Sequence, residues 1–242
     1  MPPILDPLKA LLSSFITHCS PHKNLPPTTC ETHITYLKTM AHRHGFAESV
    51  ATGRPIAADG SPLPWYTYPA IEYLSQMDAT GLRIFEYGCG NSSLFWARKG
   101  AHVWSVEHSP EWHSQLHTQS SHLKSLLLRQ EKKSYTQAIC EHDEMFDIVI
   151  IDGVWRNECC HEALKRITPD GLILLDNSDW YTDAAEILRA SRYFQIDFNG
   201  FGPINNYCWT TSIFLPLASP FTKRIRTPLP ICGIPACKGE MW

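Results

Sequence analysis

Residues 83–93, RIFEYGCGNSS, decide how this chain folds, because a short apolar run leads directly into a two-glycine turn and then into polar residues that start a helix. Glycine lets the backbone of such a turn approach a ligand closely, and the helix start offers free backbone N–H groups. A dinucleotide site would have a third glycine where this chain has Ser93. The stretch predicts a strand, a ligand-binding turn and a helix, and it disfavours a nicotinamide-dependent oxidoreductase.

Two acidic residues narrow the ligand class. Glu107 ends the next predicted strand, roughly 20 residues further on, where a carboxylate accepts hydrogen bonds from ribose hydroxyls. Glu86 stands two residues before Gly88, where its charge would attract an ammonium group and repel a pyrophosphate. A nucleoside that carries an amino-acid group, such as S-adenosylmethionine (SAM), fits both positions.

Short apolar runs alternate with helical stretches from residue 65 onward, which is typical of a parallel sheet covered by helices. We predict strands at 83–87, 102–107, 124–129, 146–152 and 172–176, and helices at 69–76, 93–99, 111–117, 158–167 and 182–190. Residues 194–198 and 207–215 flank a turn rich in Gly and Asn and predict a hairpin. The expected fold is α/β: a Rossmann-like, doubly wound, mostly parallel seven-stranded sheet with a closing antiparallel hairpin and a helical N-terminal cap.

Proline spacing suggests three segments. Residues 1–64 contain many prolines and predict a cap of short helical pieces, because proline fixes φ and lacks a backbone N–H. Residues 65–218 hold the strand and helix pattern and form the predicted SAM-binding domain. Residues 219–242 contain proline and cysteine without periodicity, which predicts an irregular tail.

Composition excludes several classes of partner. The formal net charge is −3 and the isoelectric point is near 6.4, so no basic field is available for a phosphate backbone, and we expect no nucleic-acid partner. The nine cysteines are an odd number without scaffold spacing, which favours reduced thiols. No signal peptide and no apolar run of about 18 to 20 residues is visible. We expect a cytoplasmic protein with no membrane partner, and the sequence leaves a homo-oligomer open.

At this point the chain resembles the class I SAM-dependent methyltransferases, whose first motif reads acid-x-Gly-x-Gly and is followed by an acid that closes the second strand. The resemblance runs from about residue 65 to 215. It is nearest to a bacterial subgroup with the forms Tyr-Pro-Ala, Phe-Glu-Tyr-Gly-x-Gly-Asn-Ser, Ser-Val-Glu-His and Leu-Asp-Asn-Ser, which stand here at 68–70, 85–92, 105–108 and 175–178.

The resemblance implies SAM as cofactor and a set of residues around it. Glu86, Gly88 and Gly90 would line the methionine end, and Glu107 would bind the ribose. The remaining cofactor contacts would come from Asn91 and Ser92 at the helix start, His108 near the adenine, Tyr68 closing over the cofactor, and Asp152.

A second group of polar residues closes two later strands. Asp152, Asp176 and Asn177 should meet the glycine turn at the edge where strands end, since ligands of open α/β sheets bind there. The arrangement also resembles, more distantly, the Mg²⁺ triad of metal-dependent O-methyltransferases, and Mg²⁺ prefers such oxygen ligands. The alternative is that these residues cap a helix and bind cofactor or substrate by hydrogen bonds.

The predicted function is SAM-dependent methylation of a small molecule, with a hydroxyl as the preferred acceptor. A hydroxyl needs a base or a metal, and Asp152, Asp176 and His161 are the catalytic candidates. The alternatives are an N-methyltransferase, an enzyme that resembles aminopropyltransferases, and a non-catalytic protein that binds SAM or a nucleotide.

Overall fold

The structure is a computed structural model that describes residues 27–216. The predicted tail at 219–242 and the first 26 residues of the predicted cap lie outside the described residues. Within the described cap, the chain forms α2 (Pro27–Lys38), the π-helical turn η1 (Thr39–Arg43) and α3 (Phe46–Thr52). Pro27 starts α2 rather than breaking it, because the missing N–H of proline costs nothing in the first helical turn.

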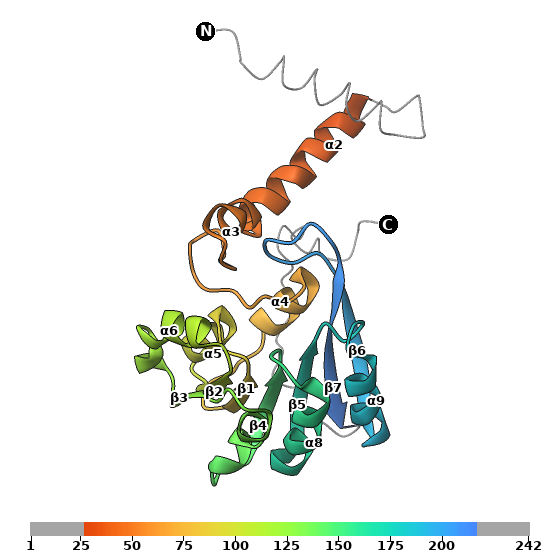
Figure 1. Cartoon of the computed structure of the whole chain (residues 1–242). Helices are drawn as coiled ribbons and strands as arrows, with labels where there is room; N and C mark the ends of the chain where they lie inside the picture. Colours follow the sequence, from red (N-terminus) through yellow and green to blue (C-terminus); the bar gives the residue numbers. More distant parts are fainter. Residues whose placement is uncertain (1–26, 217–242) are drawn as a thin grey trace.

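One seven-stranded sheet forms the centre of the molecule, with the strand order β3-β2-β1-β4-β5-β7-β6 (Figure 1). The strands are β1 (Arg83–Tyr87), β2 (His102–Glu107), β3 (Ser125–Leu128), β4 (Phe146–Ile151), β5 (Ile167–Asp176), β6 (Tyr193–Gly200) and β7 (Trp209–Pro216). Strands β1 to β5 pair in parallel, whereas β7 pairs antiparallel with both β5 and β6. The predicted fold class is confirmed, including the closing antiparallel hairpin.

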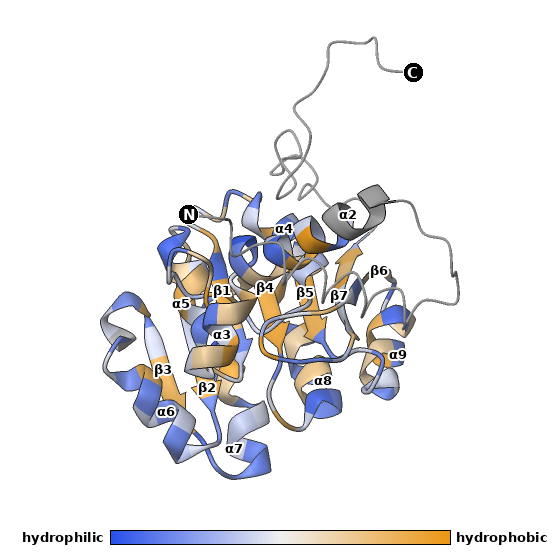
Figure 2. Cartoon of the chain, turned by 90° about the horizontal axis from the view of Figure 1, so that it is seen from above, coloured by the Kyte–Doolittle hydropathy of each residue, from blue (hydrophilic) through white to orange (hydrophobic). Residues whose placement is uncertain are grey.

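Apolar residues on both sides of the central strands create two cores. On β1, Ile84 packs into the core under α4 (Tyr68–Ser75) and α5 (Asn91–Arg98), while Phe85 and Tyr87 pack into the opposite core. That second core is covered by α7 (Lys132–Thr136), α8 (Arg156–Arg166) and α9 (Thr182–Ala190). Figure 2 shows apolar strands between helices with polar outer faces. Burial on both faces explains why these strands read as continuous apolar runs in the sequence.

The structure departs from the predicted elements mainly at their ends. Strand β5 begins at Ile167, five residues before its predicted start, and α8 begins at Arg156, two residues before its predicted start. Helices α7 and η3 (Ala138–Glu141) were not predicted, and neither has a side chain that caps its N-terminus. Helix α6 (Pro110–His117) does have one, since Ser109 accepts a hydrogen bond from the backbone N–H of Trp112, and it was predicted.

The carboxyl ends of four parallel strands meet at one edge of the sheet. Backbone hydrogen bonds continue the pairing beyond the strands, from Gly88 N–H to Val106 O at 2.8 Å and from Asp152 N–H to Tyr87 O at 3.0 Å. The glycine turn after β1 and the loop after β4 are therefore held side by side. Within residues 27–216, no helix is long and apolar enough to cross a membrane.

Candidate functional site

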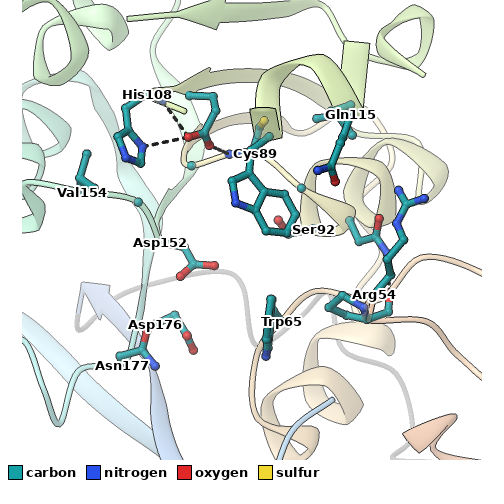
Figure 3. A pocket seen from close by; sticks show the side chains of 18 of the residues that line it. Arg54, Trp65, Cys89, Ser92, His108, Gln115, Asp152, Val154, Asp176 and Asn177 are labelled. Carbon is teal, nitrogen blue, oxygen red and sulfur yellow. Dashed lines mark hydrogen bonds and ion pairs between the residues drawn. The ribbon is translucent and has the colours of Figure 1, made fainter. Parts of the chain in front are cut away.

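A cavity of about 390 Å³ opens at this edge of the sheet (Figure 3). Its walls come from the ends of β1, β2, β4 and β5, from α6, from the loop between β6 and β7, and from the end of the cap. The residues that line it include Arg54, Pro55, Trp65, Gly88, Cys89, Gly90, Asn91, Ser92, Glu107, His108, Trp112, Leu116, Asp152, Gly153, Asp176, Asn177, Trp180, Tyr207 and Trp209. A cavity of this size is within the usual range for small-molecule sites.

The glycine turn packs backbone against backbone at the cavity floor. Gly88 has φ +90°, and a Cβ on it would lie 3.0 Å from Cα of Gly153. The hydroxyl of Ser93 accepts a hydrogen bond from Gly90 N–H at 3.3 Å and donates one to the carboxylate of Glu86. Ser93, which stands where a dinucleotide site has its third glycine, thus ties the start of α5 to the acid of β1.

Glu107 is the most densely bonded acid of the site. Its Oε1 accepts hydrogen bonds from the backbone N–H groups of His108 and Ser109, both at 2.8 Å, and contacts Nδ1 of His108 at 2.9 Å. Its Oε2 accepts one bond, from Cys89 N–H at 2.9 Å. A carboxylate oxygen has room for two donors, so Oε2 keeps one acceptor position beside the cavity. This is the geometry needed to bind a ribose hydroxyl.

Glu86 is fully buried and does not line the cavity. Burial raises the pKa of its carboxyl to about 8, although the hydroxyls of Ser92 and Ser93 oppose the shift. Its Oε1 has no hydrogen-bond partner among the described atoms, which is costly for a buried carboxyl oxygen. An ammonium group at the glycine turn would be attracted by the charge of this acid when it is ionised, so Glu86 fits the methionine end of SAM by its chemistry.

Asp152, Asp176 and Asn177 come together as predicted, but a guanidinium stands among them. Arg156 donates from Nη2 to Oδ1 of Asp152 at 3.2 Å and from Nη1 to Oδ1 of Asn177 at 3.3 Å. It also donates to the backbone oxygens of Asp152, Gly153 and Asp176. A cation supplied by the protein therefore occupies the position expected for Mg²⁺. Among the described residues, no group of three or more His, Cys, Asp or Glu side chains could hold a metal ion.

The expectation of a magnesium site does not fit this arrangement. Two of the three proposed ligands, Asp152 and Asn177, already accept hydrogen bonds from Arg156. The third, Asp176, accepts from Nε1 of Trp209 at 3.1 Å and from the hydroxyl of Thr211 through its Oδ1. Placing Mg²⁺ here would bring a divalent ion against a buried guanidinium, so we derive no step through a metal.

The two carboxyls differ from ordinary surface acids. Burial raises the pKa of Asp152 to about 6, against the opposing effect of Arg156. Burial and the neighbouring Asp152 raise the pKa of Asp176 well above its usual range. Paired acids with raised pKa values at the end of a cavity are typical of functional sites.

Aromatic side chains surround this second half of the cavity. Trp180 and Tyr207 lie with ring centroids 6.0 Å apart, and Tyr207 and Trp209 are also 6.0 Å apart. Figure 3 shows Trp65 across the cavity from Asp152 and Asp176. The cavity thus has one half beside Glu107 and the glycine turn, and an aromatic half near the two acids.

The end of the cap forms part of the wall. Arg54 and Pro55 line the cavity, and the side-chain amide of Asn91 donates to the backbone oxygen of Pro55 at 2.5 Å. This hydrogen bond joins the first residue of α5 to a segment more than 30 residues earlier in the chain. The predicted cap therefore contributes to the site directly.

The structure brings most of the predicted site residues to the cavity, namely Gly88, Gly90, Asn91, Ser92, Glu107, His108, Asp152, Asp176 and Asn177. Three do not reach it, and the first of them, Glu86 on β1, is fully buried. Tyr68 begins α4, is buried and packs against the ring of His44, with ring centroids 4.7 Å apart, where both side chains line a second cavity. His161 lies on the exposed side of α8, because that helix turns Cys159, Cys160 and Ala163 to the core. Neither Tyr68 nor His161 is placed to contact the cofactor or the acceptor at the first cavity.

Several functional side chains were missed by sequence reasoning. Arg156 carries a recognisable signal, since it stands four residues after Asp152 at the start of a helix. Trp112, Trp180 and Trp209 carry no local signal, because they come from a helix, a turn and a strand that only the fold brings together.

Comparison with known proteins gives structural likeness only. No family model matches the chain, and no curated protein matches it. Precorrin-6y C5,15-methyltransferase from Geobacter metallireducens is 16% identical with a TM-score of 0.47, over 61% of this chain and 87% of that one. An rRNA methylase from Streptococcus thermophilus is 13% identical with a TM-score of 0.43, over 61% and 96%. A Streptococcus mutans protein named as a methyltransferase and solved with SAH is 14% identical with a TM-score of 0.45, over 60% and 94%.

Identities and TM-scores of this size carry no functional argument. The fold assignment rests on the strand order and the directions of the strands, and the function has to be argued from the cavity.

Proposed function

We propose that this protein is a SAM-dependent methyltransferase that acts on a small molecule. The observation that carries the proposal is the juxtaposition at the cavity floor, where Glu107 accepts the N–H of Cys89 and keeps one acceptor position beside the glycine turn. When bound, SAM supplies a methyl group on a sulfonium, which leaves the sulfur as a neutral thioether when an acceptor lone pair forms the new bond.

Different residues would bind the different parts of SAM. Glu107 would hold the ribose, and His108, Trp112 and Leu116 form the neighbouring wall for the base. The buried carboxyl of Glu86, with its unpaired Oε1, would attract the ammonium group of the methionine end. Tight packing of Gly88 on Gly153 keeps the backbone close to the ligand.

The acceptor half offers a base and positioning. Asp152, whose pKa of about 6 leaves it mostly ionised at neutral pH, would take a proton from the acceptor, and the aromatic walls would exclude water. For a hydroxyl acceptor, the preference from sequence, this carboxylate is the base that the site provides in place of magnesium. An amine acceptor is the second candidate, favoured by the aromatic rings around the two acids.

The first test is calorimetric titration of the purified protein with S-adenosylhomocysteine (SAH). We expect saturable binding that weakens about 10- to 100-fold in Glu107→Ala, since a charge-assisted hydrogen bond is lost. Glu186→Ala, an exposed acid on α9 outside the cavity, is the matched control and should bind as the wild type does. Absence of SAH binding in the wild type would refute the proposal.

Two further outcomes separate the remaining alternatives. Product analysis with SAM and with decarboxylated SAM distinguishes methyl transfer from aminopropyl transfer, because only the transferred group differs. Binding of SAH without turnover on any acceptor would support the non-catalytic alternative.

A further inference from the structure

The aromatic half of the cavity combines four rings with two carboxyl groups. Trp65, Trp180, Tyr207 and Trp209 line it, together with Asp152 and Asp176. Trp180 and Tyr207 are 56% and 46% exposed, so much of their apolar surface faces an open volume rather than protein. Trp209 is buried and anchors this wall through its hydrogen bond to Asp176.

Two buried carboxyls and one guanidinium share this half of the cavity, and burial raises the pKa of Asp176 well above its usual range. Arg156 is 7% exposed, and its bonds to side chains go to Asp152 and Asn177. Asp176 receives the bonds of Trp209 and Thr211 on Oδ1, whereas Oδ2 accepts none from the described part of the chain. One guanidinium thus faces two buried carboxyls. Among the described residues that line the cavity there is no lysine, and Arg54 belongs to the cap wall.

A carboxyl without an ion-pair partner beside aromatic faces favours cations, because a bound ammonium group stabilises the ionised form of Asp176. The faces of aromatic rings carry negative electrostatic potential and attract ammonium groups within about 6 Å of the ring centroid. The same surroundings repel phosphate and carboxylate, and a neutral hydroxyl can donate a hydrogen bond to the acid but gains no attraction between opposite charges.

Resting on the proposed function, we propose that the methyl acceptor is a small organic amine that enters as an ammonium ion, held between these aromatic rings and the carboxyls of Asp152 and Asp176. Asp152 then takes one proton from the ammonium nitrogen, which frees the lone pair that the transfer requires. The proton leaves to water after the product departs, so charge balances over the cycle. The acceptor body is apolar or planar, as the surrounding rings demand.

The test compares two probes that differ in one heavy atom. Phenethylamine and 2-phenylethanol are titrated separately into the protein saturated with SAH, and affinity is measured by calorimetry at pH 7. We expect the amine to bind about tenfold more tightly than the alcohol. A cation–π contact shielded from water, with a carboxylate nearby, accounts for a difference of this size. Equal affinity, or preference for the alcohol, would overturn the inference and favour a hydroxyl acceptor.

Three variants test which residues cause the tighter binding of phenethylamine. Asp176→Asn keeps the acceptor oxygen for Trp209 and Thr211 but cannot ionise beside an ammonium group, so it should abolish the amine preference while SAH still binds. Tyr207→Leu changes a half-exposed ring and should weaken phenethylamine several-fold without unfolding the protein. Phe194→Leu alters a ring that is 57% exposed on β6 outside the cavity and should change neither affinity.

The pH dependence gives an independent readout. Lowering the pH from 7 to 5 protonates Asp152, whose pKa is about 6, and should weaken phenethylamine but not 2-phenylethanol. Failure of SAH to bind would refute the proposed function itself, whereas SAH binding without an amine preference would refute only the acceptor class.

Discussion

Glu86 is an acid that the fold keeps away from water, and its protonation therefore couples to stability. Its pKa is raised from 4.5 to about 8 in the folded protein, so the folded state holds more protons than the unfolded state between these values. Stability contributed by this group is highest below pH 4.5 and is lost as the pH rises through about 8. Glu86→Gln removes this dependence.

We expect Glu86→Gln to flatten the stability profile between pH 5 and 8 and to raise the free energy of unfolding at pH 7 by on the order of 3 kcal/mol. The measurement is urea unfolding across that pH range, with Glu186→Gln on α9 as the control. A wild-type profile that rises steadily from pH 5 to 8 with no change in the variant would contradict the assignment.

The same residue should release a proton when the cofactor binds. An ammonium group beside Glu86 favours its ionised form, so the pKa falls and SAH affinity increases with pH up to about 8. Calorimetry in two buffers of different ionisation enthalpy measures the proton count directly. We expect close to one proton released at pH 7 in the wild type and none in Glu86→Gln.

Arg156 was not foreseen from the sequence, and it changes the chemistry of the site. Replacing it by Ala would leave Asp152, Asp176 and Asn177 without their internal cation. We expect Arg156→Ala to gain millimolar Mn²⁺ binding, detected by electron paramagnetic resonance, whereas the wild type and Arg156→Lys bind none. Mn²⁺ binding by the wild type at the same strength would show that the guanidinium does not exclude the metal.

At the scale of elements, the glycine turn offers a prediction with a built-in control. Gly88 has φ +90° and close contact with Gly153, whereas Gly81 has φ +74° and nothing within 4 Å of its Cβ position. Gly81→Ala should cost only the positive-φ penalty of about 1 kcal/mol. Gly88→Ala should cost about 2 to 4 kcal/mol by adding a backbone clash, and it should abolish SAH binding. Chemical unfolding and calorimetry on both variants decide this.

The strands were predictable because a buried strand leaves a continuous apolar run in the sequence. Runs such as Phe146–Ile151 are apolar on both faces, and the acids and glycines that follow them mark the sheet edge. Helices with capping side chains, such as α6 after Ser109, were also visible. Helix α7 was not, since Lys132–Thr136 has no cap and its order comes from Tyr135 packing in the core beneath it.

The sequence predicts a site residue correctly only where the residue that belongs to a recognisable motif is also the residue that lines the cavity. Glu107 and the glycine turn satisfy this, because strand pairing fixes their distance. Tyr68 does not line this cavity, whereas Trp65, three residues earlier in the chain, does. The aromatic half depends on tertiary contacts between the segment before α4, the turn after β5, the loop between β6 and β7, and β7 itself, which no single-sequence pattern reveals.

At the scale of the whole molecule, ligand binding should stabilise every part that meets at the cavity. SAH at about 100 times its dissociation constant adds about 2.7 kcal/mol to the free energy of unfolding, because it binds only the folded state. We expect the melting temperature to rise with SAH and to be unaffected by Mg²⁺ or EDTA. Melting scans with adenosine alone, which lacks the amino-acid group, are the control, and a shift that requires Mg²⁺ would restore the metal hypothesis.

The crowding of tryptophan around one cavity also has an optical consequence. Four of the eight tryptophans in the chain, Trp65, Trp112, Trp180 and Trp209, line the cavity, and two of these, Trp112 and Trp180, are 43% and 56% exposed. Indole emission shifts to shorter wavelength as water leaves the ring. A large share of the intrinsic fluorescence therefore reports occupancy of a single volume, with Trp112 sensing the half beside Glu107 and Trp180 the aromatic half. Binding of unlabelled metabolites can therefore be screened in a plate reader by the shift of the tryptophan emission.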